Sequence, residues 1–192
     1  AEIAVGLGKY IVDGGLSLRF SPRHADKVLQ TSTLDLALRD TQTRFYALDM
    51  RTINKEFNVD DGFNISKVKI QDFASTGALK YMVSTFDYTD QMLRDNEYGD
   101  GRRVVTFANM LQHDAYPLAQ SVDFMLSKGQ AEMCRPIEIE FAGVVDEKDG
   151  NKGRIYWLQI RPIIDRKDLV DESMLLIEDK DILLKSNTAL GH

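Results

Sequence analysis

The sequence has 192 residues, of which 43% are hydrophobic and 28% charged, a balance typical of a folded domain rather than a disordered chain. At about 100–200 residues per domain, this length corresponds to one domain, or to one domain and part of another. The 24 basic and 30 acidic side chains give a net charge of -6, which argues against a basic nucleic-acid-binding surface over the whole molecule.

Features that the sequence lacks indicate the cellular compartment of the protein. Cys134 is the single cysteine, so no intramolecular disulfide can form, and this favours a reducing compartment. The sequence has no signal peptide and no apolar run near the about 18 residues of a membrane span. We therefore expect a cytoplasmic protein that binds neither membrane nor nucleic acid. Because the chain starts without methionine and enters a strand-like stretch at once, we interpret it as a piece of a larger protein.

Local patterns predict the first elements of the chain. A strand is expected over Glu2–Val5, followed by the glycine turn Gly6-Leu7-Gly8 and a short helix over Lys9–Asp13. Apolar and polar residues alternate over Leu16–Phe20, which predicts a half-buried strand. Further strand-like runs are Lys27–Ser32, Thr43–Met50 and Lys67–Phe73.

Polar loops and two helices are predicted next. The polar stretch Thr52–Asn64, with a turn at Asp61-Gly62, and the charged stretch Asp95–Arg102 are expected to be loops. Pro117 suits the first turn of a helix. The apolar faces of the two helices are Val104, Phe107, Ala108 and Leu111 in the first, and Leu118, Val122, Met125 and Met133 in the second. The fold class is therefore α+β, mainly antiparallel sheet flanked by helices.

A β-hairpin is predicted over 135–162. Its strands are Ile137–Val145 and Arg154–Ile160, with the turn residues Asp149-Gly150 in the loop between them. Glu138 and Glu140 lie on one face of the first strand. On the second strand, Gln159 and Arg161 are expected on the face opposite to Tyr156, Leu158 and Ile160. With a two-residue turn, Glu138 pairs with Arg161 and Glu140 with Gln159.

Two interpretations of this patch remain open. Mg²⁺ prefers hard oxygen ligands and is often held by one or two carboxylates and the phosphates of a substrate, and an arginine binds a phosphate through its planar fork. Two carboxylates, an amide and a guanidinium would thus suit a metal–nucleoside triphosphate. The alternative, which the pattern alone favours, is a solvated face whose cross-strand ion pairs each contribute ~0.2–1 kcal/mol.

Other chemical motifs in the sequence are weaker. The glycine turn lies between a strand and a helix, where backbone N–H groups can face an anion. However, Ile11 stands where a dinucleotide-binding fingerprint needs a third glycine, and Tyr10 stands where a P-loop needs Ser or Thr. His24 and His113 have no partners at the spacing of metal ligands. No Ser-His-Asp catalytic arrangement is recognisable in the sequence.

Three segments together resemble a known family. Pro136–Ala142 and Trp157–Pro162 are similar to the end of the ATP-grasp nucleotide-binding domain of the phosphoenolpyruvate synthase (pyruvate, water dikinase) and pyruvate, phosphate dikinase family, and Ala4–Gly14 resembles an upstream segment of that domain. The Gln-x-Arg-Pro motif favours the synthase branch. The resemblance implies that residues 1–164 are the C-terminal part of an ATP-grasp domain, and that 165–192 connect to the next domain.

The resemblance assigns roles to the hairpin residues. Glu140 and Gln159 would hold Mg²⁺ against the nucleotide phosphates, and Glu138 would lie beside them on the metal or the nucleotide. Arg161 would contact the terminal phosphates and act in the transfer. Such transfer needs positioning and charge neutralisation from the protein. The implied cofactors are ATP and Mg²⁺.

The sequence also departs from the family pattern. Gly6 and Gly8 would bind the nucleotide, but Lys9 follows them where the synthases usually carry an acid, and Glu138 replaces the usual Asp. The sequence contains no threonine-histidine segment of a phosphohistidine domain, and no lysine- and arginine-bearing first half of the ATP-grasp fold. We expect Leu175–Ser186 to lead into the next domain.

The implied activity belongs to a larger enzyme. In this family ATP phosphorylates a histidine on a swivelling domain, which then passes the phosphoryl group to pyruvate. The expected partners are therefore ATP, pyruvate and that domain, with a homodimer as one possible form of the full-length enzyme, and the chain alone would be inactive. The alternatives are a non-catalytic nucleotide-sensing module and a dikinase with a different phosphoryl acceptor.

Overall fold

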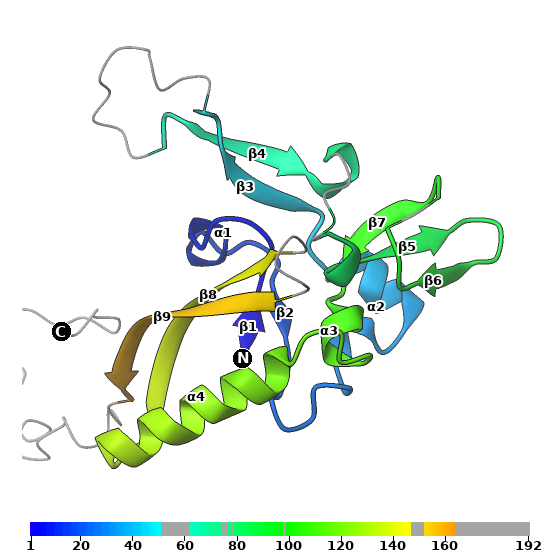
Figure 1. Ribbon diagram of the computed structural model, residues 1–192. Helices are drawn as coiled ribbons and strands as arrows, with labels where there is room; N and C mark the ends of the chain where they lie inside the picture. The colour runs from blue at the N-terminus through cyan, green and yellow to red at the C-terminus, as the bar shows by residue number, and fades with distance from the viewer. Residues whose placement is uncertain (51–61, 74–76, 78, 98, 147–151, 164–192) are drawn as a thin grey trace, which may run out of the picture.

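The computed structural model describes residues 1–50, 62–73, 77, 79–97, 99–146 and 152–163. These residues form a mixed α+β structure (Figure 1). The helices are α1 (Lys9–Val12), α2 (Leu34–Arg39), α3 (Ala108–Leu111) and α4 (Leu118–Met133), with 3₁₀ turns η1 (Leu29–Thr31), η3 (Ile70–Asp72) and η4 (Leu79–Tyr81). The strands are β1 (Glu2–Ile3), β2 (Leu18–Arg19), β3 (Arg44–Leu48), β4 (Ile65–Lys69), β5 (Val83–Asp87), β6 (Met92–Arg94), β7 (Arg102–Val105), β8 (Ile137–Asp146) and β9 (Lys152–Pro162).

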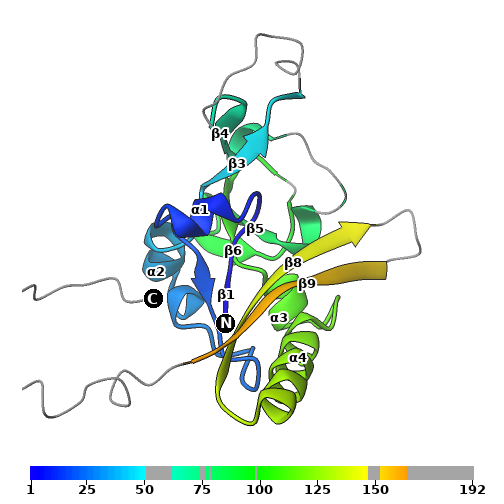
Figure 2. The same ribbon diagram turned by 90° about the vertical axis from the view of Figure 1, so that its left-hand side faces the viewer.

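The strands form small antiparallel sheets rather than one large one. The pairs are β1–β2, β3–β4 and β8–β9, and β5 lies between β6 and β7 in a three-stranded sheet. The β3–β4 hairpin projects from the body on the side away from α4, and α4 runs beside the β8–β9 hairpin in both views (Figures 1 and 2). No described helix is both long and apolar enough to cross a membrane.

The core lies where these small sheets meet. Ile70 is fully buried, and Val83 and Val105 are each 1% exposed. They pack in a cluster that draws apolar side chains from β1, β2, β3, η4, α3 and the first turn of α4. Since burial of such side chains is the main favourable term in folding, this cluster holds the separate sheets together.

Three glutamine side chains join segments that no strand pairing connects. Gln42 accepts a hydrogen bond from the Val5 amide and donates to the Val5 and Arg44 carbonyls, each at 2.8 Å. Gln30 and Gln71 bond backbone groups in the same manner. Gln30 accepts from Arg19 N and donates to Ser17 O and Asp40 O, and Gln71 accepts from Arg103 N and donates to Gly101 O.

Most predicted elements are present, with bounds that differ by a few residues. The first strand and helix, the strand at 44–48, the helix that follows Pro117 and both hairpin strands are confirmed. The strand predicted over Lys67–Phe73 is only partly right, because β4 ends at Lys69 and η3 follows. The sequence patterns missed α2 and the β5–β6 hairpin. The Asp149-Gly150 turn and Leu175–Ser186 lie outside the described residues.

Two predictions are wrong for local reasons. Lys27–Ser32 contains η1 instead of a strand, because the Thr31 and Ser32 hydroxyls donate to carbonyls three residues earlier and favour a turn. The first predicted helix shrinks to the four residues of α3. Val104 belongs to β7, and Phe107 takes a left-handed φ of 51° that breaks a continuous helix.

Candidate functional site at the β8–β9 hairpin

The predicted register of the hairpin is confirmed at its base. Glu138 pairs with Arg161, and Glu140 pairs with Gln159. All four side chains are exposed to solvent. The structure therefore brings together every hairpin residue to which the sequence assigned a metal or phosphate role.

A β-bulge corrects the predicted faces further along the hairpin. The register shifts after Glu140, so Trp157 rather than Leu158 lies opposite Phe141. Trp157 and Ile160 both reach α4, since a Cβ on Gly129 would lie 3.3 Å from the Trp157 ring and 2.9 Å from Ile160 Cδ1. The prediction that Tyr156, Leu158 and Ile160 share one face is thus wrong. The bulge turns the Trp157 ring toward the helix and leaves Leu158 63% exposed.

Arg161 and Glu138 form a two-pronged ion pair. Arg161 Nε lies 3.1 Å from Glu138 Oε2, and Nη2 lies 3.0 Å from Oε1, the paired geometry that suits a guanidinium and a carboxylate. The hydrogen bond from Arg161 lowers the pKa of Glu138. The pKa of Arg161 is raised, first by its hydrogen bond to Glu138 and further by the charges of Glu138 and Glu140. Both carboxylates therefore act on one guanidinium.

This pair gives a prediction about the pKa of Glu138. The substitution Arg161→Met is expected to raise that pKa toward its ordinary value, because the main hydrogen bond to the carboxylate is lost. The measurement is a carbon-detected NMR titration of the Glu138 carboxyl. Arg135→Met, which removes an exposed arginine just before β8, is the control and should leave the titration unchanged.

The lowered pKa of Glu138 also determines how the stability of the fold depends on pH. The pair stabilises the fold above the pKa that Glu138 has in the unfolded chain, and this contribution is lost as the pH falls through the lower folded pKa. The side chains of Arg161 and Glu138 are 55% and 53% exposed, so the free energy involved is small. An identical Glu138 titration in Arg161→Met and the parent chain would contradict the assignment.

The donor set fits a hard cation only in part. Glu138, Glu140 and Gln159 offer carboxylate and amide oxygens, which Mg²⁺ accepts together with waters and substrate phosphates. In the part of the chain that the structure describes, no group of three or more His, Cys, Asp or Glu side chains is placed to hold a metal ion. A metal on this hairpin would therefore need oxygens from a nucleotide as well.

The glycine turn is built into the fold by backbone contacts. Gly6 has a φ of +96°, and the Leu7 amide donates to the Tyr46 carbonyl at 3.1 Å. Gly8 precedes the four residues of α1. Lys9 pairs with Asp13 at 3.3 Å, which offsets the positive charge that departs from the family pattern. The Leu7 N–H is thus directed to β3 rather than to an anion.

A cavity of about 990 Å³ joins the glycine turn to the outer half of the hairpin. Gly6 and Gly8 line one side of it, Phe141 and Leu158 line another, and Phe124 of α4 also contributes to the lining. None of Glu138, Glu140, Gln159 and Arg161 lines this cavity. The hairpin base, next to the C-terminal end of α4, and the glycine turn beside β1 are therefore separate places on the described structure (Figure 2).

The structure also places a serine, an aspartate and a histidine in contact, although the sequence showed no such arrangement. Ser84 Oγ donates to Asp95 Oδ1 at 2.8 Å, and His113 Nε2 lies 3.0 Å from Asp95 Oδ2. The aspartate separates the serine from the histidine, and Ser84 is fully buried. A nucleophilic serine needs the histidine next to its hydroxyl, so this chain of contacts is structural.

Comparison with known proteins places the chain in no family. No family model matches the chain, and no curated protein and no solved structure matches it.

Proposed function

We propose that this chain is the C-terminal part of an ATP-grasp nucleotide-binding domain of a phosphoenolpyruvate synthase-like enzyme. In this proposal the base of the β8–β9 hairpin faces Mg²⁺-ATP. The pairing of Glu138 with Arg161 and of Glu140 with Gln159 is the observation that supports it most, because it gathers the motif residues on one patch. The resemblance of Ala4–Gly14 to the upstream segment of such a domain is independent support.

In this proposal the four side chains take the roles that the resemblance implies. Glu140 and Gln159 would hold Mg²⁺, which neutralises charge on the phosphates when it is bound. Glu138 would lie beside the metal and orient Arg161, whose remaining N–H groups would contact the terminal phosphates. The chain would position and neutralise phosphates, while pyruvate and the phosphorylated histidine would belong to other domains.

The exposed apolar surface of the hairpin also favours a larger domain. Large apolar side chains that gather on one exposed element are usually covered by another part of the protein or by a partner. On β8, β9 and the residue after them, the exposed large apolar side chains are Val144, Tyr156, Trp157, Leu158, Ile160 and Ile163. They form the type of surface that the rest of an ATP-grasp domain would cover.

The test is a calorimetric titration of the chain with Mg²⁺-ATP. We expect weak binding, which the double substitution Glu140→Ala plus Arg161→Ala weakens further because a metal ligand and the phosphate-binding guanidinium are both removed. The control is Glu132→Ala plus Lys128→Ala, which removes the same charges from the exposed face of α4 and should leave binding unchanged. Mg²⁺-ATP binding that the hairpin substitutions leave unchanged, or no binding by the parent chain, would overturn the proposal.

A further inference from the structure

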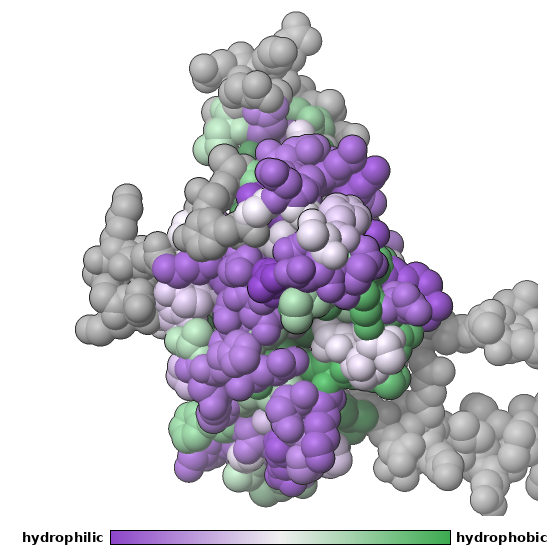
Figure 3. Space-filling view, turned by 90° about the vertical axis from the view of Figure 1, so that its right-hand side faces the viewer, coloured by the Kyte–Doolittle hydropathy of each residue, from purple (hydrophilic) through white to green (hydrophobic). Residues whose placement is uncertain are grey.

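A second surface, unrelated to the hairpin, carries concentrated positive charge. A cleft of about 480 Å³ lies between the β3–β4 hairpin and the outer edge of β7. Arg44, Lys69, Arg102 and Arg103 are among the residues that line it, with Asp100 as the single acidic residue of its lining. The face of the molecule that carries β5–β7 is predominantly hydrophilic (Figure 3).

These four cations lack acidic partners. Within the described residues, no carboxylate forms an ion pair with any of them. Five other exposed arginines do have such partners, namely Arg19 with Glu2, Arg23 with Asp123, Arg39 with Asp40, Arg94 with Asp87 and Asp90, and Arg161 with Glu138, whereas the exposed Arg135 has none among the described residues. In a chain with a net charge of -6, a cleft lined by four cations and one carboxylate has an excess of positive charge that an anion from solution would neutralise.

Two of the cations stand directly opposite each other. Arg44 of β3 and Lys69 of β4 are cross-strand partners, and both side chains are exposed. Like charges in this position destabilise a sheet, and a carboxylate at either position would instead form a favourable pair. An anion bound between Arg44 and Lys69 would remove the repulsion.

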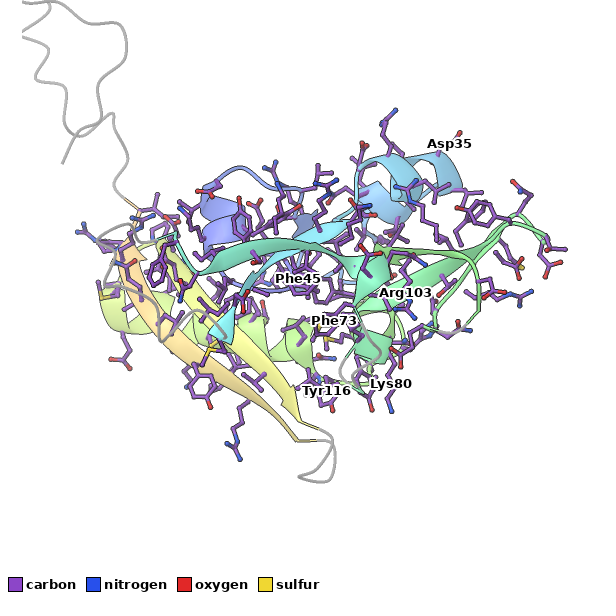
Figure 4. All side chains as sticks on the ribbon, turned by 90° about the horizontal axis from the view of Figure 1, so that it is seen from above. Asp35, Phe45, Phe73, Lys80, Arg103 and Tyr116 are labelled. Atoms are coloured by element: carbon purple, nitrogen blue, oxygen red, sulfur yellow. The ribbon has the colours of Figure 1, made fainter. Side chains whose placement is uncertain are left out.

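The two arginines of β7 are held in place by backbone carbonyls. Arg102 Nη2 donates to the Leu38 carbonyl at 2.7 Å, and Arg103 Nη1 donates to the Phe73 carbonyl at 3.0 Å. Arg103 lies beside Phe73, close to the core (Figure 4), and its buried Nε atom has no hydrogen-bond partner among the described residues. Anchored guanidinium groups lose little side-chain entropy when they bind a ligand.

We propose that this cleft binds a small ligand with two or more phosphate groups. Three arginines and a lysine match several phosphates, because guanidinium groups bind phosphate oxygens in pairs. The volume suits a small molecule. The acidic net charge of the chain disfavours a long nucleic acid, which would extend beyond the cleft. This inference does not depend on the function proposed for the hairpin.

The test uses tripolyphosphate as the probe, in low salt with EDTA so that no divalent metal contributes. Calorimetry is expected to show that Arg44→Gln plus Lys69→Gln weakens binding at least tenfold. The thermal midpoint of this variant without ligand should equal or exceed that of the parent, because the cross-strand repulsion is gone. The control Arg23→Gln plus Lys27→Gln changes the net charge equally and should bind as the parent does.

Two further measurements locate the site and define its ligand. Tripolyphosphate should shift the amide NMR signals of Thr43 and Gly101, and these two shifts should persist in the variant Glu140→Ala plus Arg161→Ala. Equal weakening by the control variant, or shifts confined to the hairpin, would overturn the proposal. Citrate binding as tightly as tripolyphosphate would overturn the phosphate assignment, and tighter binding of a single-stranded oligonucleotide would overturn the small-ligand class.

Discussion

Replacing Gln42 with methionine is expected to lower the free energy of unfolding by about 3 kcal/mol or more, because three backbone groups lose their hydrogen-bond partner. The Gln42 side chain is 1% exposed and bonds Val5 N, Val5 O and Arg44 O, each at 2.8 Å. Methionine has a similar volume and fills the same space without these bonds. Each backbone group that is left unpaired carries its own penalty of ~1–3 kcal/mol.

The other glutamines provide matched controls for this prediction. Gln30 makes three bonds of the same kind, but it is half-buried, and Gln71 makes two and is exposed. Burial decides the penalty, so we expect the loss to decrease from Gln42→Met to Gln30→Met to Gln71→Met, the last below about 1 kcal/mol. Chemical denaturation of the three variants measures this order. Equal losses would mean that burial is not the determining factor.

The substitution Gly6→Ala is expected to destabilise the chain by about 3 kcal/mol, the combined effect of backbone strain and a steric clash. The φ of +96° at Gly6 is one that residues with a Cβ rarely adopt. An added Cβ would lie 2.8 Å from the Tyr46 carbonyl oxygen and 2.9 Å from Phe45 Cβ, neither of which is a flexible side-chain end. The turn would move away from β3 and break the Leu7–Tyr46 hydrogen bond.

Substitutions at Gly14 and Gly8 allow the effect of backbone strain on stability to be measured apart from the effect of the steric clash. Gly14 has a φ of +75° with open space around it, so Gly14→Ala should lose only ~1–2 kcal/mol from strain. Gly8 has a φ of -55° and open space, so Gly8→Ala should be neutral or stabilise by ~0.4–1 kcal/mol. Unfolding curves of the three variants test this ranking. A Gly6→Ala loss no larger than that of Gly14→Ala would show that the contact with β3 adds nothing.

The hairpin shows how far the sequence alone determines the candidate site. Alternation along two strands and the turn residues between them predict a register, because strand pairing in a hairpin depends on a short loop. Glu138 and Arg161 are paired as that register requires. The bulge at Leu158 was not predictable from alternation, since it depends on how Trp157 and Ile160 pack against Gly129 of a helix.

For the basic cleft, in contrast, the sequence alone does not predict which residues come together. Arg44 and Lys69 meet through the pairing of β3 with β4, and Arg102 and Arg103 come from a different sheet. No local sequence pattern predicts that these residues come together, and Arg102 is predicted only as the end of the charged loop Asp95–Arg102. Contacts between segments far apart in sequence depend on the whole core, so a single sequence carries little signal for them.

What the sequence by itself determined is therefore local: the α+β class, the helix after Pro117, the glycine turn and the base of the hairpin, all set by short-range periodicity and turn chemistry. The tertiary structure alone decided which of these motifs meet. It set Gly6 and Gly8 against the outer half of the hairpin and left Glu140 and Arg161 at the other end. The physical reason is that packing of the shared core, rather than local preference, orients each small sheet.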